Sequence, residues 1–376
     1  MRQAHPRDPC WDVLRGAAVL GILPVNIWVF GWPLGALDQP ELGLRSNPLD
    51  YLAWWVVAVL LEHKMVLILA ALMGLGLAIM TTRPSATIVV KKRLITLAAI
   101  GLAHGYLLWW GDILWMLAIA GGLTWWSRRL PNQQLAIVGL CCLIVPSLVM
   151  LLWGLLAPSS FSHAFAPLDV THLEQSLSAY QGNIWTQFQQ RWPLALAMQT
   201  IGLITFGLWA VLGAMLLGFA GFRSGALSPT QAWLHRRNTG LLLLVAGTLT
   251  VLGHRSGLAT GTAAIIQPIA GALLSAAYVL LFVQAWASLK PQWTVRLNQI
   301  LGAVGRLSLS VYLLQSLVLS VLFYGHGLRL MGQLSLAQLL GTAGVLMLLI
   351  SVLAMLWERY LGAGPAERLW RQLSYP

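Results

Sequence analysis

The sequence is poor in charged residues and in cysteine, and both shortages narrow the class of protein. Only 9% of its 376 residues are charged and 58% are hydrophobic, whereas soluble domains contain about 25% charged residues. A soluble globular fold and an intrinsically disordered chain are therefore excluded. With three cysteines and no Cys/His spacing suited to zinc, a disulfide-stapled secreted fold is excluded too, and we predict no metal site.

Motifs that bind nucleotides or cleave peptides and esters are also absent. The chain contains no P-loop, no G-x-G-x-x-G after a strand, no H-E-x-x-H and no G-x-S-x-G. The sequence thus gives no support to nucleotide-driven pumping, zinc proteolysis or elbow-serine hydrolysis. We expect no bound cofactor.

What the sequence does contain is a series of long apolar runs. About 20 residues cross about 30 Å of hydrocarbon, so we predict an all-α, polytopic membrane bundle of about ten transmembrane helices surrounded by the lipid bilayer. These are placed at 13–33, 51–80, 94–110, 112–127, 135–156, 194–219, 239–255, 263–289, 307–323 and 336–357.

Two of these runs allow an alternative. The first could be a signal peptide, but Asp12 and Arg15 stand at its start and no A-x-A site follows, which favours a retained helix. The run 51–80 is too long for one upright span, and Glu62-His63-Lys64 interrupts it. It is either one strongly tilted helix or two pieces broken at those charges.

The net charge of +12 lies in short clusters between the apolar runs. Because no soluble basic face gathers these charges, we expect no nucleic-acid partner. With the N-terminus inside, eighteen of the 23 Lys and Arg residues lie at cytoplasmic ends and four lie outside. The positive-inside rule then predicts that both termini are cytoplasmic.

A polar stretch at 157–193 divides the chain into two halves, 1–156 and 194–376, with five predicted spans each. On the predicted topology it is a periplasmic loop. An odd number of spans per half gives the halves opposite orientations, an arrangement that recurs in secondary transporters.

Ionisable residues inside spans are costly and therefore need a partner or a function. His104 precedes the turn Trp109-Trp110-Gly111-Asp112 by a few residues, and Gly101 and Gly105 flank it in a G-x-x-x-G pair that allows close helix approach. A neutral imidazole here could accept a proton from a hydroxyl or amine, with Asp112 orienting it. Alternatively, His104 bonds a neighbouring helix and Asp112 caps the next span.

Two further groups of polar residues lie in the predicted spans. Glu62 and Lys64 are candidates for substrate contact, although a Glu–Lys pair around a helix break explains them equally well. Asp12 and Arg15 are one turn apart, which suggests a simple surface pair. Arg15 and Asn26 are nearly three whole turns apart and share a face, so both are candidates for substrate contact, although packing between helices would explain Asn26 equally well.

The span 307–323 carries a polar stripe, with Ser308, Tyr312 and Gln315 at i, i+4 and i+7 and Arg306 at its inner end. A polar stripe of this kind is unfavourable in contact with lipid. We predict that Arg306, Tyr312 and Gln315 face a protein interior or a water-filled cavity, although polar contacts between helices would account for them as well.

Taken in order, these segments resemble the YeiB family of bacterial inner-membrane proteins, whose C-terminal half defines domain of unknown function 418 (DUF418). The matching segments are Asp12–Gly16 through to Asn26, Lys64 with Ala70–Gly76, Gly101–Gly105 with Trp110–Leu114, Gly305–Arg306 with Tyr312–Ser316, and Gly364–Arg371. The resemblance implies a multi-pass protein of the bacterial inner membrane. That family is similar to a wider group of transmembrane acyltransferases that includes heparan-α-glucosaminide N-acetyltransferase.

Two functions from different classes follow. The first is an acyltransferase in which cytoplasmic acyl-CoA, such as acetyl-CoA, is held at its phosphates by basic loops such as Arg83–Arg93. His104 is then the general base on an outer-side or membrane acceptor, and Asp112 supports it. The second is a secondary transporter of a small solute that uses Glu62, Lys64 and Asp112. The acceptor, the acyl chain and the oligomeric state, including a homodimer, stay open.

Overall fold

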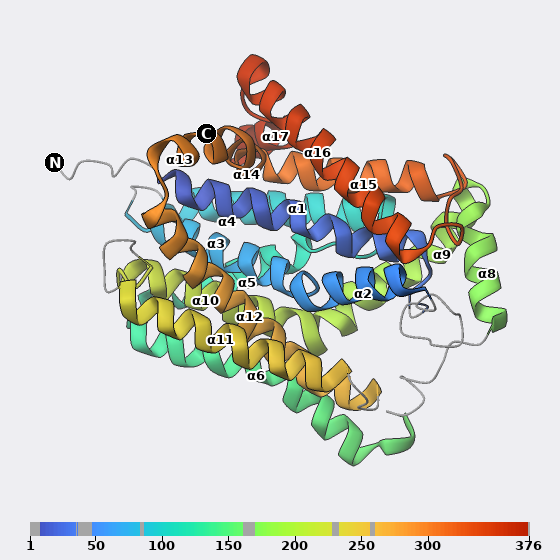
Figure 1. The fold of residues 1–376 in the computed structure, drawn as a ribbon, viewed down its shortest axis with the longest axis horizontal. Coiled ribbons are helices and arrows are strands. Elements are labelled where there is room, and N and C mark those ends of the chain that lie inside the picture. Colours follow the sequence, from blue (N-terminus) through green and yellow to red (C-terminus); the bar gives the residue numbers. More distant parts are fainter. Residues whose placement is uncertain are drawn as a thin grey trace.

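A computed structural model describes residues 8–34, 36, 47–82, 86–160, 170–227, 233–255 and 260–374, and these residues form helices and turns without a strand. Most helices run side by side along the long axis of the molecule (Figure 1). From the N-terminus they are α1 (Pro9–Gly31), α2 (Pro48–Leu60), α3 (Lys64–Met80), α4 (Ala86–Leu107), α5 (Leu114–Trp126), the 3-10 helix η3 (Ser127–Arg129) and α6 (Asn132–Leu156). They continue with α8 (Val170–Gln181), α9 (Ile184–Ala197), the π-helix η4 (Met198–Gly207), α10 (Leu208–Arg223), α11 (Trp233–Arg255), α12 (Thr260–Ser288), α13 (Pro291–Leu297), the π-helix η5 (Asn298–Gly302), α14 (Ala303–Arg306), α15 (Ser308–Phe323), α16 (Leu336–Leu361) and α17 (Pro365–Ser374).

Several of these helices are long and apolar enough to cross a membrane. Within the described residues, five stretches meet this criterion by themselves: Pro9–Gly31, Pro48–Met80 (α2 with α3), Asn132–Leu156, Ile265–Ser288 and Leu336–Leu361. Two bent pairs, Ile184–Thr205 with Leu208–Arg223 and Pro291–Arg306 with Ser308–Phe323, bring the number to seven if each pair is one span and not a re-entrant loop. The molecule is thus a membrane helical bundle, while the count of about ten and the direction of each span stay predictions.

The predicted hairpin 94–110 and 112–127 is present as α4 and α5. Neither helix meets the length and composition expected of a membrane-spanning helix. Helix α5 has only 13 residues, and α4 carries Lys91, Lys92 and Arg93 in its first half. A pair of this kind needs neighbouring helices around it to lie in a membrane.

The long predicted run 51–80 is two helices, and the break falls at its charges. Helix α2 ends at Leu60, α3 begins at Lys64, and His63 between them has a left-handed backbone with φ 63°. The buried Lys64 ammonium donates to the Ala58 carbonyl at 2.7 Å. It therefore satisfies one of the last carbonyls of α2, which have no partner inside their own helix.

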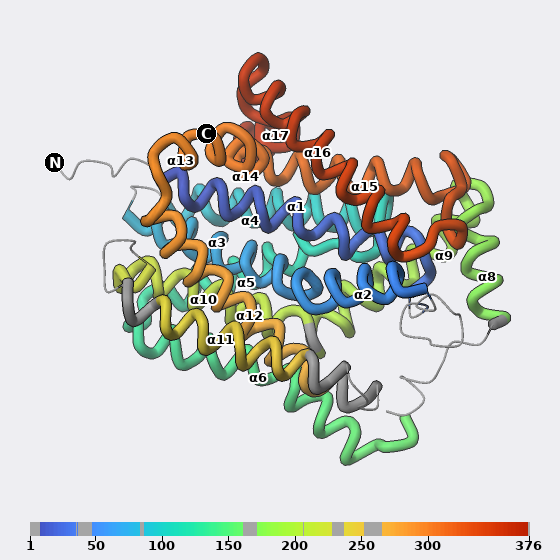
Figure 2. The backbone as a smooth tube through the Cα atoms, viewed as in Figure 1, coloured from blue at the N-terminus to red at the C-terminus, as the bar shows by residue number. Residues whose placement is uncertain are grey.

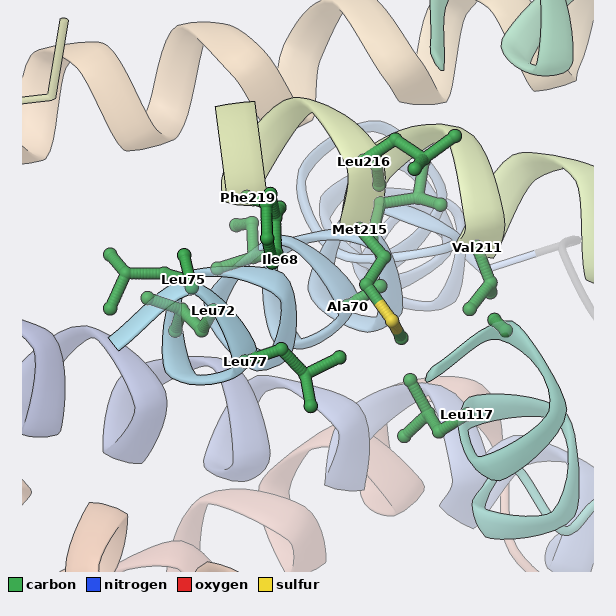
Figure 3. Close-up of a cluster of buried hydrophobic side chains, with 14 of the residues drawn as sticks. Ile68, Ala70, Leu72, Leu75, Leu77, Leu117, Val211, Met215, Leu216 and Phe219 are labelled. Atoms are coloured by element: carbon green, nitrogen blue, oxygen red, sulfur yellow. The ribbon is translucent and has the colours of Figure 1, made fainter. Parts of the chain in front are cut away.

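The main core joins α3 to α10. Figure 3 shows Ile68 and Ala70 of α3 beside Phe219 and Met215 of α10, within one buried apolar cluster. The two backbones approach so closely that a Cβ on Gly74 would overlap the Met215 carbonyl, and one on Gly218 would overlap that of Ala71. The small-residue run Ala70–Gly76 is therefore required by packing, as for small residues between membrane helices generally.

A second close crossing holds α1 against η5 and α14, which lead into α15. A Cβ on Gly16 would overlap the Leu301 carbonyl, and one on Gly305 would overlap the Asp12 carbonyl. The glycines of the two motifs, Asp12–Gly16 and Gly305–Arg306, thus face each other. Figure 2 shows α13, α14 and α17 gathered at the end where α1 begins, while α8 and α9 lie at the opposite end.

Gly74 and Gly76 of α3 differ in the space around their Cβ positions, and alanine substitution tests this difference. We expect Gly74→Ala to destabilise the protein by about 1–3 kcal/mol, because its methyl group meets backbone that cannot rotate away. The matched control is Gly76→Ala, since no heavy atom lies within 4 Å of its Cβ position. Thermal unfolding in detergent should show a lower melting temperature for the first variant only, and equal melting temperatures would contradict this packing.

Candidate active site

His104 and Asp112 form a buried pair at the turn between α4 and α5. Imidazole Nδ1 lies 2.9 Å from Asp112 Oδ1, and the two side chains are 1% and 0% exposed. The other carboxylate oxygen, Oδ2, accepts a hydrogen bond from the Trp115 backbone N–H at 2.9 Å. Asp112 therefore caps the first turn of α5 and holds His104 at the same time. The two roles considered for Asp112 coexist.

The second imidazole nitrogen is left without a partner. His104 Nε2 is buried and makes no hydrogen bond within the described part of the chain. When Nδ1 donates to a carboxylate, Nε2 of the neutral ring carries the lone pair. The pair has the geometry of a base histidine oriented by a carboxylate.

The two glycines beside His104 make this geometry attainable. A Cβ on Gly101 would overlap the Trp115 backbone nitrogen and lie 2.8 Å from Asp112 Oδ2. A Cβ on Gly105 would overlap the side-chain amide of Gln199 in η4. The predicted close approach is confirmed, and it brings two elements to the histidine: α5 and the π-helix.

Two aromatic rings lie close to the imidazole. The Tyr312 ring centroid is 5.1 Å from that of His104, and the Trp109 centroid is 6.4 Å away. The Tyr312 hydroxyl accepts a hydrogen bond from the Ile113 backbone N–H at 3.3 Å. Tyr312, from the far end of the sequence, is thus fixed against the hairpin turn.

A large cavity ends at Tyr312. Its volume is about 1640 Å³, which exceeds the roughly 300–1,000 Å³ of sites for drug-sized ligands. The deep lining is apolar and includes Val19, Leu69, Ile113 and Leu114 together with Tyr312. His104 does not line the cavity itself, so one tyrosine ring separates the imidazole from this space.

The opposite end of the cavity is rich in arginine. Its lining includes Arg15, Arg93, Arg306 and Arg371, together with Asp8, Asp12 and Glu367. Of the basic stretch Arg83–Arg93, residues 83–85 lie outside the described residues, and Lys91 and Lys92 are exposed. Arg93 is the member of that stretch that reaches the cavity, where its guanidinium lies 4.1 Å over the Trp370 ring.

Not every arginine at this end is equally available. Arg306 is fixed by Glu358, with Nη2 donating to Oε2 at 2.7 Å, and by Asn298, whose Oδ1 accepts from Nη1 at 2.8 Å. Arg15 pairs with Asp12 at 3.1 Å as predicted. The description of that pair as a surface pair was wrong, because the Asp12 side chain is 4% exposed at the close crossing of α1 and α14.

Glu367, which sequence reasoning left unassigned within the C-terminal motif, closes this end of the bundle. Its carboxylate accepts hydrogen bonds from the backbone N–H groups of Leu309 and Ser310 at 2.8 and 3.1 Å, and from the Ser310 hydroxyl. These are first-turn groups of α15, so α17 caps the helix that carries Tyr312. This contact could not be predicted from the sequence, because the motif that contains Glu367 and the motif at the start of α15 lie far apart along the chain.

Gln315 and Asn26, two polar residues that were predicted to face the protein interior, are also buried. Gln315 donates from Nε2 to the Val19 carbonyl at 3.2 Å, and its Oε1 has no partner among the described residues. Asn26 is 7% exposed, and its Nδ2 is likewise unpartnered there. Neither residue lines the cavity. Their burial agrees with the predicted interior face, while substrate contact stays a prediction.

Glu62 and Lys64 belong to a different place, the break between α2 and α3. Glu62 Oε2 accepts from Gln267 Nε2 of α12 at 3.2 Å, and the Lys64 carbonyl accepts from the Ser275 hydroxyl at 3.2 Å. Lys64 also bonds the Ala58 carbonyl. The structure therefore does not bring these two residues to His104 and Tyr312, and neither of them lines the cavity.

The end of the bundle near α8 and α9 is packed with aromatic rings. Trp109 stacks on Phe30 at 5.1 Å, Phe30 on Tyr324 at 5.3 Å, and Tyr324 on Tyr180 at 4.9 Å. The buried Arg191 caps α4 by donating to the Tyr106 carbonyl at 3.0 Å. These contacts cover the hairpin turn on the side away from the arginine-rich end.

In class, the molecule is a helical membrane protein with a buried histidine–carboxylate pair beside an interior cavity. Residues 221–376 match the family described as a protein of unknown function (DUF418). The chain is 30% identical to the uncharacterized protein YeiB of Escherichia coli (strain K12), over 98% of this chain and 96% of that protein. It is 27% identical to the uncharacterized protein YxaH of Bacillus subtilis (strain 168), over 97% and 93% of the two chains. The chain belongs to the YeiB family of DUF418 proteins. No solved structure matches it.

Removing the Glu367 cap should destabilise the end of the bundle that supports Tyr312. We expect Glu367→Ala to lower the stability by about 0.5–2 kcal/mol or more, as for loss of a helix cap. The control is Glu174→Ala, which removes an exposed carboxylate from α8. Thermal unfolding measures both variants, and a Glu367→Ala melting temperature equal to that of the wild type would show that the cap is dispensable.

Proposed function

We propose that the protein is a transmembrane acyltransferase of the bacterial inner membrane. It moves an acyl group from cytoplasmic acyl-CoA, acetyl-CoA in the simplest case, to a hydroxyl or amine on a periplasmic-side or membrane acceptor. The observation that carries the proposal is the buried His104–Asp112 pair, with an unpartnered Nε2, one ring away from a cavity that has an arginine-rich end.

The cavity suits a donor of this shape. The arginine-rich end offers Arg93 and Arg371 to the phosphates of coenzyme A, and planar guanidinium groups bind phosphate oxygens in pairs. The apolar depth then holds the thinner pantetheine arm, so that the thioester arrives at Tyr312 and Ile113. On the predicted topology the arginine-rich end faces the cytoplasm, where acyl-CoA is found.

The chemistry needs one base and one orienting group. His104 Nε2 takes the proton from the acceptor O–H or N–H while the acceptor oxygen or nitrogen attacks the thioester carbonyl. The carbon–sulfur bond then breaks, and the imidazolium returns its proton to the leaving thiolate. Asp112 keeps the ring in the tautomer with the proton on Nδ1 and stabilises the imidazolium between the two steps.

Alanine at His104 tests this assignment. Transfer of a radiolabelled acetyl group from acetyl-CoA, in proteoliposomes supplied with a bacterial polar-lipid extract and a set of amino sugars and polyols, should fall by about 100-fold or more in His104→Ala. The control is His172→Ala, which changes an exposed histidine of α8. Unchanged transfer in His104→Ala would refute the base, and absence of transfer by the wild type would refute the acyltransferase.

A second candidate function follows from the break between α2 and α3. Discontinuous helices with polar side chains at the break form solute and ion sites in secondary transporters, and Glu62, Lys64, Gln267 and Ser275 meet at this one. Asp112, the third residue of the transporter hypothesis, is held by His104 and Trp115 instead. Uptake of amino sugars or acylated solutes into proteoliposomes without any acyl donor would favour the transporter. If the protein transfers acyl groups and takes up none of these solutes, the transporter is excluded.

A further inference from the structure

Gln199 is a buried side chain beside Gly105 and Asp112 that the proposed reaction has not used. It lies in η4, a π-helix of ten residues, and is 7% exposed while its neighbours Met198 and Thr200 are exposed. Long π-helical segments are rare and often occur at functional sites. Gln199 continues the buried face of α9, which carries Arg191 and Ala195 at the same four-residue spacing, while its adjacent residues face outward.

Gln199 is held at the hairpin turn by a hydrogen bond to its backbone carbonyl, and its side-chain amide makes none among the residues that the structure describes. The Gln199 carbonyl accepts a hydrogen bond from the Trp115 indole at 3.3 Å. The side-chain nitrogen fills the space where Gly105 would carry a Cβ, a position that is also 3.5 Å from Asp112 Cβ. Gln199 thus approaches the same aspartate that orients His104.

Both polar atoms of this amide lack a partner within the described residues. Gln199 Nε2 and Oε1 are buried and make no hydrogen bond there, and His104 Nε2 is in the same condition. An unsatisfied buried polar group costs about 1–3 kcal/mol, so three such atoms around one turn are expensive to keep. Glycine at 105 leaves the room that the amide occupies. The cost is offset if a ligand supplies the missing partners.

We propose, on the basis of the acyltransferase assignment, that Gln199 binds the acceptor substrate. The donor arrives at Tyr312 and Ile113, and Gln199 offers its amide at the same hairpin turn, beside Gly105 and Asp112. There the nucleophilic hydroxyl or amine of the acceptor faces His104 Nε2, and a second hydrogen-bonding group beside it pairs with the Gln199 amide. The acceptor class is therefore a polyol or amino alcohol with neighbouring polar groups, as in a sugar or a glycerol headgroup, and not a simple alcohol.

The test uses Gln199→Leu, which keeps the volume of the side chain and removes both polar atoms. With whichever acceptor of the polyol and amino-sugar set the wild type acylates best, kcat/KM for that acceptor should fall at least 10-fold, while KM for acetyl-CoA stays unchanged. The matched control is Gln284→Leu in α12, whose buried Nε2 is also unpartnered among the described residues. It should retain wild-type kinetics.

Thermal unfolding supplies a readout that does not depend on activity. Because the leucine removes unsatisfied polar atoms, Gln199→Leu should melt no lower than the wild type. An equal kcat/KM for the acceptor in Gln199→Leu and the wild type, a rise in KM for acetyl-CoA, or a lower melting temperature would each overturn the proposal. Failure of the acyltransferase assignment itself is seen separately, as the absence of transfer by the wild-type protein.

Discussion

The site depends on how closely α4 and α5 approach each other at their shared turn. Without a side chain at Gly101, the Trp115 backbone reaches Asp112 Oδ2 and leaves Oδ1 for His104. One carboxylate therefore closes a helix and orients an imidazole in a place where water is excluded. In a low-dielectric interior such bonds are stronger, and an unpaired group is more costly, than at a surface. The unpartnered Nε2 of His104 is accordingly the feature of this turn that calls for a function.

The rest of the bundle positions this turn through glycine contacts and helix caps. Membrane helices associate by close packing rather than by a hydrophobic driving force, and α3 with α10 and α1 with α14 meet at backbone distance. The second crossing places the start of α15, which Glu367 then caps from α17. The cavity between these elements ends at Tyr312 of α15, beside the imidazole. Tight packing at both crossings thus fixes the distance between an arginine-rich opening and a buried base.

Local features of this site could be predicted from the sequence, whereas contacts between distant segments could not. The His104–Asp112 pair lies within nine residues, and its glycine spacing indicated a close helix pair. The charges at 62–64 marked the break of the long run but left its form open until the left-handed His63 was seen. The contacts of Glu367 with Leu309 and of Gln199 with Trp115 join residues 58 and 84 positions apart in the chain, and a π-helix has no simple sequence signature. The count of ten spans rested on apolar length, a criterion that the short α5 and the cationic α4 do not meet.

The central claim is that the cavity brings an acyl group to His104. The most direct measurement is a cryo-electron microscopy structure of the protein in nanodiscs with an acetyl-CoA analogue whose thioester is replaced by a ketone. We expect the nucleotide to bind at Arg93 and Arg371 and the pantetheine arm to lie along the apolar lining. The ketone should then lie beside Tyr312, with room for one acceptor group next to His104 Nε2. Saturating analogue that leaves the cavity empty, or that binds with its ketone away from the hairpin turn, would contradict it.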